Sequence, residues 1–263
     1  RRRRAIEKEN YMKILALSLF LGCSVQVSAQ EDANNVIKAI YTEALGEQQG
    51  YKWLHYMCTA IGPRPSGSEA ANQAARYTKQ MMLEAGADTA WLQPVEVPKW
   101  YRGTEWSKAY AGGDSVSLPT TALGGSVPTP KEGLKAEVVE VGSFEELEVL
   151  GKDGVEGKIV FYNTYMDHSL ISTFNAYGGA VKYRWAGAME AGKLGAVATV
   201  MRSVTLLRDD LPHTGAMSYG DSEVKIPTAA VSWQAADRLN QMLEGGTVEL
   251  ELFLDCGVQG TAT

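Results

Sequence analysis

Residues 186–198 read Ala-Gly-Ala-Met-Glu-Ala-Gly-Lys-Leu-Gly-Ala-Val-Ala, and residues 226–232 read Ile-Pro-Thr-Ala-Ala-Val-Ser. The first stretch predicts the end of a helix, a stop at Gly195 and then a strand over 196–201. The second predicts another short, buried strand centred on 228–231. Helices that lead into apolar strands are typical of α/β units, so this region predicts an α/β fold.

The same alternation continues on both sides of this region. It predicts strands over 136–141, 158–162 and 247–254, and helices over 145–150, 180–194 and 235–243. Nearer the N-terminus it predicts helices over 36–45 and 51–61, a third helix capped by Ser66 and ended by Gly86, and an edge strand over 91–97. Residues 100–135 are rich in Gly, Pro, Ser and Thr and predict no long regular element.

The composition is that of an ordinary globular protein. Of the 263 residues, 45% are hydrophobic and 21% are charged, and the formal net charge is -6. Nucleic-acid binding needs a cationic face, so we expect no nucleic-acid partner. Export would permit a disulfide between Cys58 and Cys256, but their apolar surroundings favour two separate buried thiols.

The N-terminus predicts an export signal. Met12 and Lys13 precede a short apolar run over 14–23, and small residues over 27–29 precede a cleavage point at Gln30. The run is too short to span a bilayer, so we expect no membrane span and a periplasmic or extracellular protein. A lipoprotein acylated at Cys23 and a buried N-terminal helix are the less favoured alternatives.

Two loop residues are candidates for ligand contact. Arg64 lies in Gly-Pro-Arg-Pro-Ser-Gly-Ser over 62–68, where the prolines stiffen the loop, although local sequence alone favours a structural Arg. His213 lies in Pro-His-Thr-Gly over 212–215, a loop that could reach across an interface. No set of residues has metal-ligand spacing, and no nucleophile motif occurs, so we assign no catalytic residue and no metal ligand.

Several short motifs occur in an order and spacing that are specific when taken together. They cover most of residues 50–255, in the segments 53–64, 66–68, 92–103, 157–163, 183–184, 195–198, 202–204, 212–215 and 225–229. In these motifs the chain resembles the carboxypeptidase Q family of di-zinc metallopeptidases. Pro65 departs from the more usual apolar residue, and we expect it to change only the rigidity of the loop.

The resemblance implies a secreted exopeptidase that hydrolyses short peptides with two zinc ions, whether as an aminopeptidase, a carboxypeptidase or a dipeptidase. It leaves a homodimer open. The family's zinc ligands and catalytic Glu follow a further strand, and no matching position occurs among these residues. The resemblance therefore predicts that this chain alone holds no zinc and is inactive. From their places in the two loops, we expect Arg64 and His213 to lie at the rim of the substrate cleft of the full-length enzyme.

The expected fold is the N-terminal part of a zinc exopeptidase α/β domain, interrupted by an inserted protease-associated domain. The expected segments are a signal peptide with upstream residues (1–29), the N-terminal part of the peptidase domain (30–99), the inserted domain (100–245) and the start of the return into the peptidase domain (246–263). Two alternatives stay open. One is a non-catalytic secreted binding module built on a protease-associated domain, and the other is an inactive relative with an interaction role.

Overall fold

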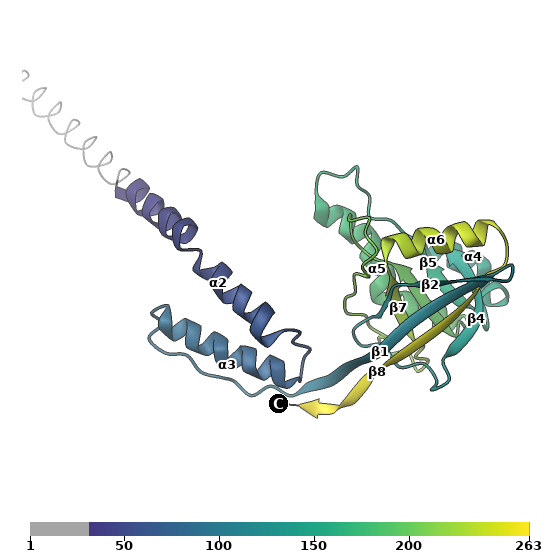
Figure 1. The fold of residues 1–263 in the computed structure, drawn as a ribbon, viewed down its shortest axis with the longest axis horizontal. Coiled ribbons are helices and arrows are strands. Elements are labelled where there is room, and N and C mark those ends of the chain that lie inside the picture. Colours follow the sequence, from purple (N-terminus) through teal and green to yellow (C-terminus); the bar gives the residue numbers. More distant parts are fainter. Residues whose placement is uncertain (1–31, 263) are drawn as a thin grey trace, which may run out of the picture. The chain divides into compact units, whose positions relative to one another are not determined.

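The computed structural model describes residues 32–262 (Figure 1). The expected signal segment, 1–29, lies outside the described residues. The chain divides into two compact units, one comprising residues up to Pro63 with Gln73–Ala90, the other comprising Arg64–Asn72 and the residues from Trp91 onward. Within the described range, no helix has both the length and the apolar character needed to cross a membrane.

Helices make up the N-terminal region. A helix over residues 32–47 ends at Gln48, whose φ of 49° is left-handed. Helix α2 (Gln49–Tyr56) follows at once and continues into a π-helical turn, η1 (Met57–Ile61). The break between the two predicted helices is therefore a single residue. Many apolar side chains of these helices are exposed, namely Val36, Ile37, Ile40, Tyr41, Leu45, Tyr51 and Leu54.

Helix α3 (Glu69–Glu84) begins two residues later than the sequence predicts. Its capping side chain is Ser68, whose hydroxyl accepts a hydrogen bond from the Ala71 backbone N–H at 3.1 Å. The prediction of Ser66 as the cap is wrong because the chain is still turning there, with the Ser68 N–H bonded to the Pro65 carbonyl. The helix ends just before Gly86, whose φ of 95° suits a helix terminus.

An eight-stranded sheet dominates the second unit, with the strand order β2-β1-β8-β4-β5-β6-β7-β3. Four neighbouring strands run parallel, namely β4 (Leu134–Val141), β5 (Ile159–Tyr162), β6 (Ala198–Arg202) and β7 (Thr228–Val231). Antiparallel strands flank them, namely β8 (Glu249–Ala262), β1 (Val97–Ala111) and β2 (Asp114–Leu118) on one side and β3 (Thr120–Ala122) on the other. The predicted α/β class is confirmed.

The sheet curls until its two edges meet. Strands β2 and β3 stand at opposite ends of the strand order, yet only Pro119 separates them in the sequence. The hydroxyl of Ser107 on β1 also contacts the hydroxyl of Thr120 on β3. Curling of this kind leaves few unpaired strand edges open to other chains.

Alternate residues of the buried strands face two apolar cores. Ile159 and Phe161 of β5 belong to a core that draws on all eight strands and on α6 (Trp233–Glu244). Val160 and Tyr162 face the other way, towards α4 (Phe144–Val155) and α5 (Thr173–Lys193). This period of two places helices on both faces of the parallel strands. The three predicted helices of this unit are present, and each is longer than predicted.

Gly187 allows α5 to lie close to β5. A Cβ atom at this position would lie 2.7 Å from Cε2 of Tyr162, well inside van der Waals contact. The Tyr162 hydroxyl donates a hydrogen bond to the Gly187 carbonyl at 2.9 Å. Gly187 therefore serves close packing of the helix on the sheet.

Residues 91–135 depart most from the sequence-based expectation. Residues 91–96 form no strand, and the 15-residue strand β1 replaces the expected irregular region. β1 pairs with β8 from Val97–Ala262 to Tyr110–Glu249, with two shifts of register. Because its partner lies about 150 residues away, no local periodicity announces this strand. The predicted domain boundaries fall inside β1 and just before β8, and they stay a prediction.

Cys58 and Cys256 are separate free thiols. Cys256 is buried as expected, but the expected burial of Cys58 is wrong, since its side chain is exposed on η1.

Candidate functional site

Polar side chains gather where the parallel strands end. Asn163 follows β5, Arg202 ends β6 and Ser232 follows β7. In open α/β sheets, ligands bind outside the carboxyl ends of parallel strands, because loops from neighbouring strands converge there. We call the residues that end or follow these three strands (163–172, 202–216 and 232–238) the carboxyl edge.

Arg202 anchors the carboxyl edge, and its side chain is fully buried, at 0% exposure. Its Nε donates to Asn163 Oδ1 at 2.7 Å, and its Nη2 donates to the Tyr165 hydroxyl at 2.8 Å. Its Nη1 lies 2.8 Å from Asp237 Oδ1 and donates to the Trp233 carbonyl at 3.2 Å. A buried charge is tolerated when it is paired and hydrogen-bonded in this way. Arg202 therefore ties β5, β6 and the start of α6 together.

Two aromatic rings complete the surroundings of Arg202. Its Cζ lies 3.9 Å from the ring centroid of Tyr165 and 4.9 Å from that of Trp233. Burial raises the pKa of the Tyr165 hydroxyl, although the Arg202 charge opposes the change. The phenol therefore stays protonated at neutral pH. The enclosed guanidinium supports the edge and is not available to a ligand.

Sequence reasoning did not single out Arg202. A signal was present, because a charged residue ends the otherwise apolar strand Ala-Thr-Val-Met-Arg over 198–202. Its partners come from two other segments, after β5 and within α6, so their convergence is visible only in the fold.

His213 lies in the loop between β6 and β7, at the carboxyl edge. Its backbone N–H donates to the Ser203 hydroxyl at 2.8 Å. Its Nε2 lies 3.4 Å from Asp209 Oδ1, within ion-pair distance, but is buried and makes no hydrogen bond of good geometry. The side chain as a whole is 37% exposed. The ring is therefore open to solvent while Nε2 is directed at Asp209.

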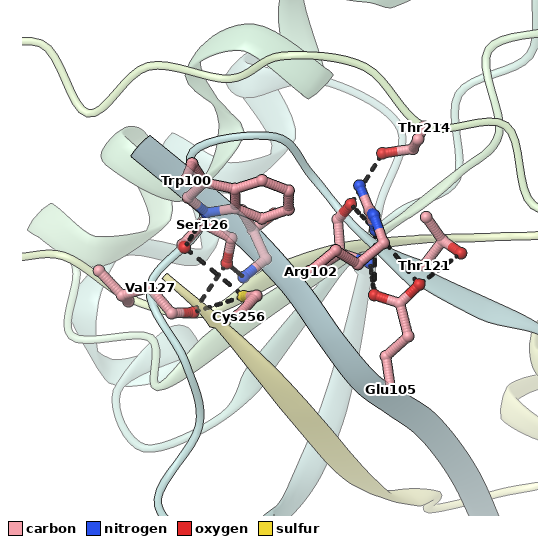
Figure 2. A network of polar contacts seen from close by, with 10 residues as sticks. Trp100, Arg102, Glu105, Thr121, Ser126, Val127, Thr214 and Cys256 are labelled. Carbon is pink, nitrogen blue, oxygen red and sulfur yellow. Dashed lines mark hydrogen bonds and ion pairs between the residues drawn. The ribbon is translucent and has the colours of Figure 1, made fainter. Parts of the chain in front are cut away.

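The loop that carries His213 is fixed to β1 through the network in Figure 2. The Thr214 hydroxyl donates to the Ala122 carbonyl at 2.8 Å, and Arg102 Nη1 donates to the same oxygen at 2.8 Å. Glu105, also on β1, accepts from the Ala122 N–H and from the Thr121 hydroxyl, each at 2.8 Å, and forms an ion pair with Arg102. His213 therefore sits on a firmly held backbone.

The other half of this network surrounds Cys256 (Figure 2). The Trp100 indole N–H donates to the Ser126 carbonyl at 3.0 Å, and the Cys256 thiol lies 3.5 Å from the same oxygen. Burial raises the pKa of the Cys256 thiol to about 11. A thiol that stays protonated is a poor nucleophile, so Cys256 serves packing and not catalysis.

Arg64 lies in the loop between η1 and α3 and is partly buried. Positive φ angles at Gly62 (78°) and Gly67 (77°) turn the chain on both sides of it, as the loop motif leads one to expect. Arg64 and His213 thus occupy two separate, defined loops. Their shared place at the rim of a substrate cleft stays a prediction.

The part of the chain that the structure describes does not fit a zinc site. Over residues 32–262, no three His, Cys, Asp or Glu side chains cluster as a metal ion would require. Asp209 and His213 supply two such groups. Asp210 is engaged by the Ser232 hydroxyl and by Arg238, contacts that lower the pKa of its carboxyl group. We therefore derive no metal chemistry from these residues.

The comparisons with known proteins agree on one group of relatives, although no family model matches the chain. Carboxypeptidase Q from Xenopus laevis is 38% identical over 221 residues, which is 84% of this chain and 45% of that protein. Carboxypeptidase Q from Bos taurus is 36% identical over 200 residues, which is 76% of this chain and 40% of that protein.

A solved structure agrees with these sequence relatives. The crystal structure of a peptidase M28 precursor from Shewanella amazonensis SB2B matches with a TM-score of 0.81 at 30% identity, covering 87% of this chain and 51% of that one. The chain thus spans about half the length of the proteins it matches. The resemblance that the sequence motifs indicate is confirmed: over most of its length, this chain is a homologue of carboxypeptidase Q with a peptidase M28-like fold.

Proposed function

We propose that the chain is the N-terminal part of an exported exopeptidase that hydrolyses short peptides with two zinc ions. The observation that carries this proposal is the 38% identity to carboxypeptidase Q over 84% of the chain. We place the zinc ligands and the catalytic Glu in the remainder of the longer protein.

Two preparations test this proposal, namely the 263-residue chain and the longer translation of the same reading frame. After rinsing with a chelator, the longer protein should retain about two zinc ions and release amino acids from dipeptides. The 263-residue chain should do neither. Two tightly held zinc ions on the short chain would contradict the proposal. A stop codon directly after residue 263, or a longer protein without peptidase activity, would favour the non-catalytic binding module.

We also propose that residues 100–245 form a protease-associated domain inserted into the peptidase domain. The second compact unit and its curled sheet, with helices on both faces, support a separately folded module. This unit comprises Arg64–Asn72 and the residues from Trp91 onward, so it extends past both proposed bounds and includes β8. Limited proteolysis of the whole chain should leave a resistant core whose ends lie near 100 and 245. Early cleavage within 158–231, before any cleavage near Trp100, would count against the insertion.

We propose that Arg64 and His213 lie at the rim of the substrate cleft in the longer enzyme. Both sit on loops that are held by turns or hydrogen bonds, and rigidly held loops often carry function. Arg64→Ala or His213→Ala would then remove a polar contact to the substrate and lower kcat/KM by about 10- to 100-fold. If Tm falls while the activity of the folded fraction stays within about twofold, the two side chains are structural.

A further inference from the structure

An apolar pocket of about 500 Å³ opens beside the carboxyl edge. Its lining comes from the loop after β5, the first turns of α5 and the loop after β6, namely Met166, Thr173, Phe174, Tyr177, Val204, Thr205, Leu206 and Leu207. The volume lies in the range of small-molecule sites, roughly 300–1,000 Å³. The position outside the ends of parallel strands is where α/β sheets bind ligands.

The pocket has a packed floor and an exposed apolar rim. Met166 is buried in a small apolar cluster with the start of α5, and Val204 packs against that cluster. At the rim, Phe174 is 86% exposed and Leu207 is 60% exposed. Large apolar side chains exposed together around a hollow are typical of a binding site.

Arg184 brings a positive charge to one side of this pocket. It lies two turns after Tyr177 on α5, and its Nη2 donates to the hydroxyl of this pocket-lining residue. Arg184 Cζ also lies 5.3 Å from the centroid of the Tyr177 ring, and its Nε is buried without a hydrogen-bond partner. No carboxylate of residues 32–262 forms an ion pair with it. A partly buried cation without a counter-charge favours an anionic ligand nearby.

The loop that carries His213 lies next to residues that adjoin the pocket. A Cβ on Gly215 would lie 2.6 Å from Arg184 Cζ, so the guanidinium rests directly on the backbone of that loop. On the other side, Ser203, which precedes the pocket residue Val204, accepts the hydrogen bond from the His213 N–H. Arg184 and the His213 loop therefore each adjoin the lining of the pocket, Arg184 at Tyr177 and the loop next to Val204.

We propose that this pocket binds the C-terminal residue of a short peptide, with the apolar side chain in the hollow and the carboxylate facing Arg184. The inference rests on the proposed peptidase function and adds a substrate class to it, peptides that end in an apolar residue. The chemistry recognised is an apolar group next to a carboxylate. A fatty acid shares that chemistry, but the adjoining His213 loop favours a peptide.

Isothermal titration calorimetry of the 263-residue chain with four probes tests the proposal. The probes are Gly-Leu, Gly-Gly, Gly-Leu amide and octanoate. Gly-Leu should bind with a Kd on the order of 1 mM or below and at least about tenfold more tightly than Gly-Gly, because the leucine side chain leaves water. Amidation should weaken binding by about tenfold or more, because it removes the charge that faces Arg184.

Three results would overturn the proposal. They are equal affinity for Gly-Leu and Gly-Gly, an amide that binds as well as the free acid, and octanoate that binds more tightly than Gly-Leu. The last result would assign the pocket to free fatty acids.

Variants separate the two parts of the pocket. Arg184→Gln should reduce the affinity for Gly-Leu to the affinity for Gly-Leu amide and leave the binding of the amide unchanged. Phe174→Ser should weaken the binding of both Gly-Leu and its amide by about threefold or more. Val149→Ser is the matched control, because Val149 is 88% exposed and lines a different hollow beside α4. Circular dichroism verifies folding. A Phe174→Ser effect below threefold, or one equalled by the control, would contradict the pocket.

This experiment needs no catalysis, so it fails independently of the proposed function. If the short chain binds Gly-Leu but the longer protein hydrolyses no peptide, the pocket stands and the peptidase proposal falls. If the longer protein hydrolyses peptides without preference for an apolar C-terminal residue, and the short chain binds none of them, the pocket proposal falls alone.

Discussion

Replacing Arg202 with methionine tests whether the buried guanidinium supports the carboxyl edge. Methionine keeps a long apolar stem, so the change removes the charge and its donors with little loss of volume. Asp237 is 43% exposed and can be solvated again, which limits the cost of losing the ion pair. Asn163 is buried, and its Oδ1 loses its donor, whereas the Trp233 carbonyl keeps the intrahelical hydrogen bond that it accepts as the first residue of α6.

The magnitude follows from the Asn163 oxygen atom. Leaving one buried acceptor without its partner costs about 1–3 kcal/mol, so we expect a loss of about 2 kcal/mol in the free energy of unfolding. For a unit of this size, 1 kcal/mol corresponds to about 2–4 °C in Tm. We therefore expect Arg202→Met to lower Tm by about 4–8 °C.

Urea unfolding followed by far-ultraviolet circular dichroism measures this loss, with an unchanged m value as the sign that only stability has changed. Arg208→Met is the matched control, because Arg208 lies over the same Trp233 ring, at 5.6 Å, but is exposed. It should change the free energy by less than about 0.5 kcal/mol. A loss below about 1 kcal/mol for Arg202→Met, or equal losses for the two variants, would refute the reasoning.

Two further predictions concern packing and burial. Gly187→Ala should lower the free energy of unfolding by about 1–3 kcal/mol, because the new Cβ would lie 2.7 Å from Tyr162. Gly178→Ala on the same helix meets nothing within 4 Å and should be neutral or stabilising. Chemical denaturation measures both changes. At pH 8, iodoacetamide should modify exposed Cys58 at least about 100-fold faster than Cys256, since burial raises the pKa of the Cys256 thiol to about 11 and leaves little thiolate. Peptide mapping gives both rates.

The controls for these predictions lie in the same samples. Equal stability of the two glycine variants would show that α5 can move away from β5 without cost. In urea, the two cysteines should react at similar rates, and equal rates in the native protein would show that Cys256 is not protected by the fold.

The α/β units could be predicted from the sequence because their signals are local. Strand β7 has the bounds that the sequence predicts, 228–231. The helix stop predicted at Gly195 coincides with a glycine whose φ is 83°. In both cases a few adjacent residues carry the physical cause, which is a short apolar run or a backbone angle that suits glycine.

The candidate site was predictable only in part. His213 was visible through the Pro and Gly residues that bound its loop, and the structure places it at the carboxyl edge. Arg184 and Arg202 lie in two of the family motifs but were not named as site residues, because an arginine in a helix or at the end of a strand is common and only its distant partners distinguish it. The pocket beside them draws its lining from three separate segments.

The sequence by itself determined the alternation of helices and strands, the turns between them and the kinship with carboxypeptidase Q. The tertiary structure alone decided that β1 pairs with β8, that the sheet curls until β2 meets β3, and that Arg202 is buried. The physical reason is range. A turn or an amphipathic strand depends on neighbouring residues, whereas strand pairing and the burial of a charge depend on partners that only the folded chain brings within a few ångströms.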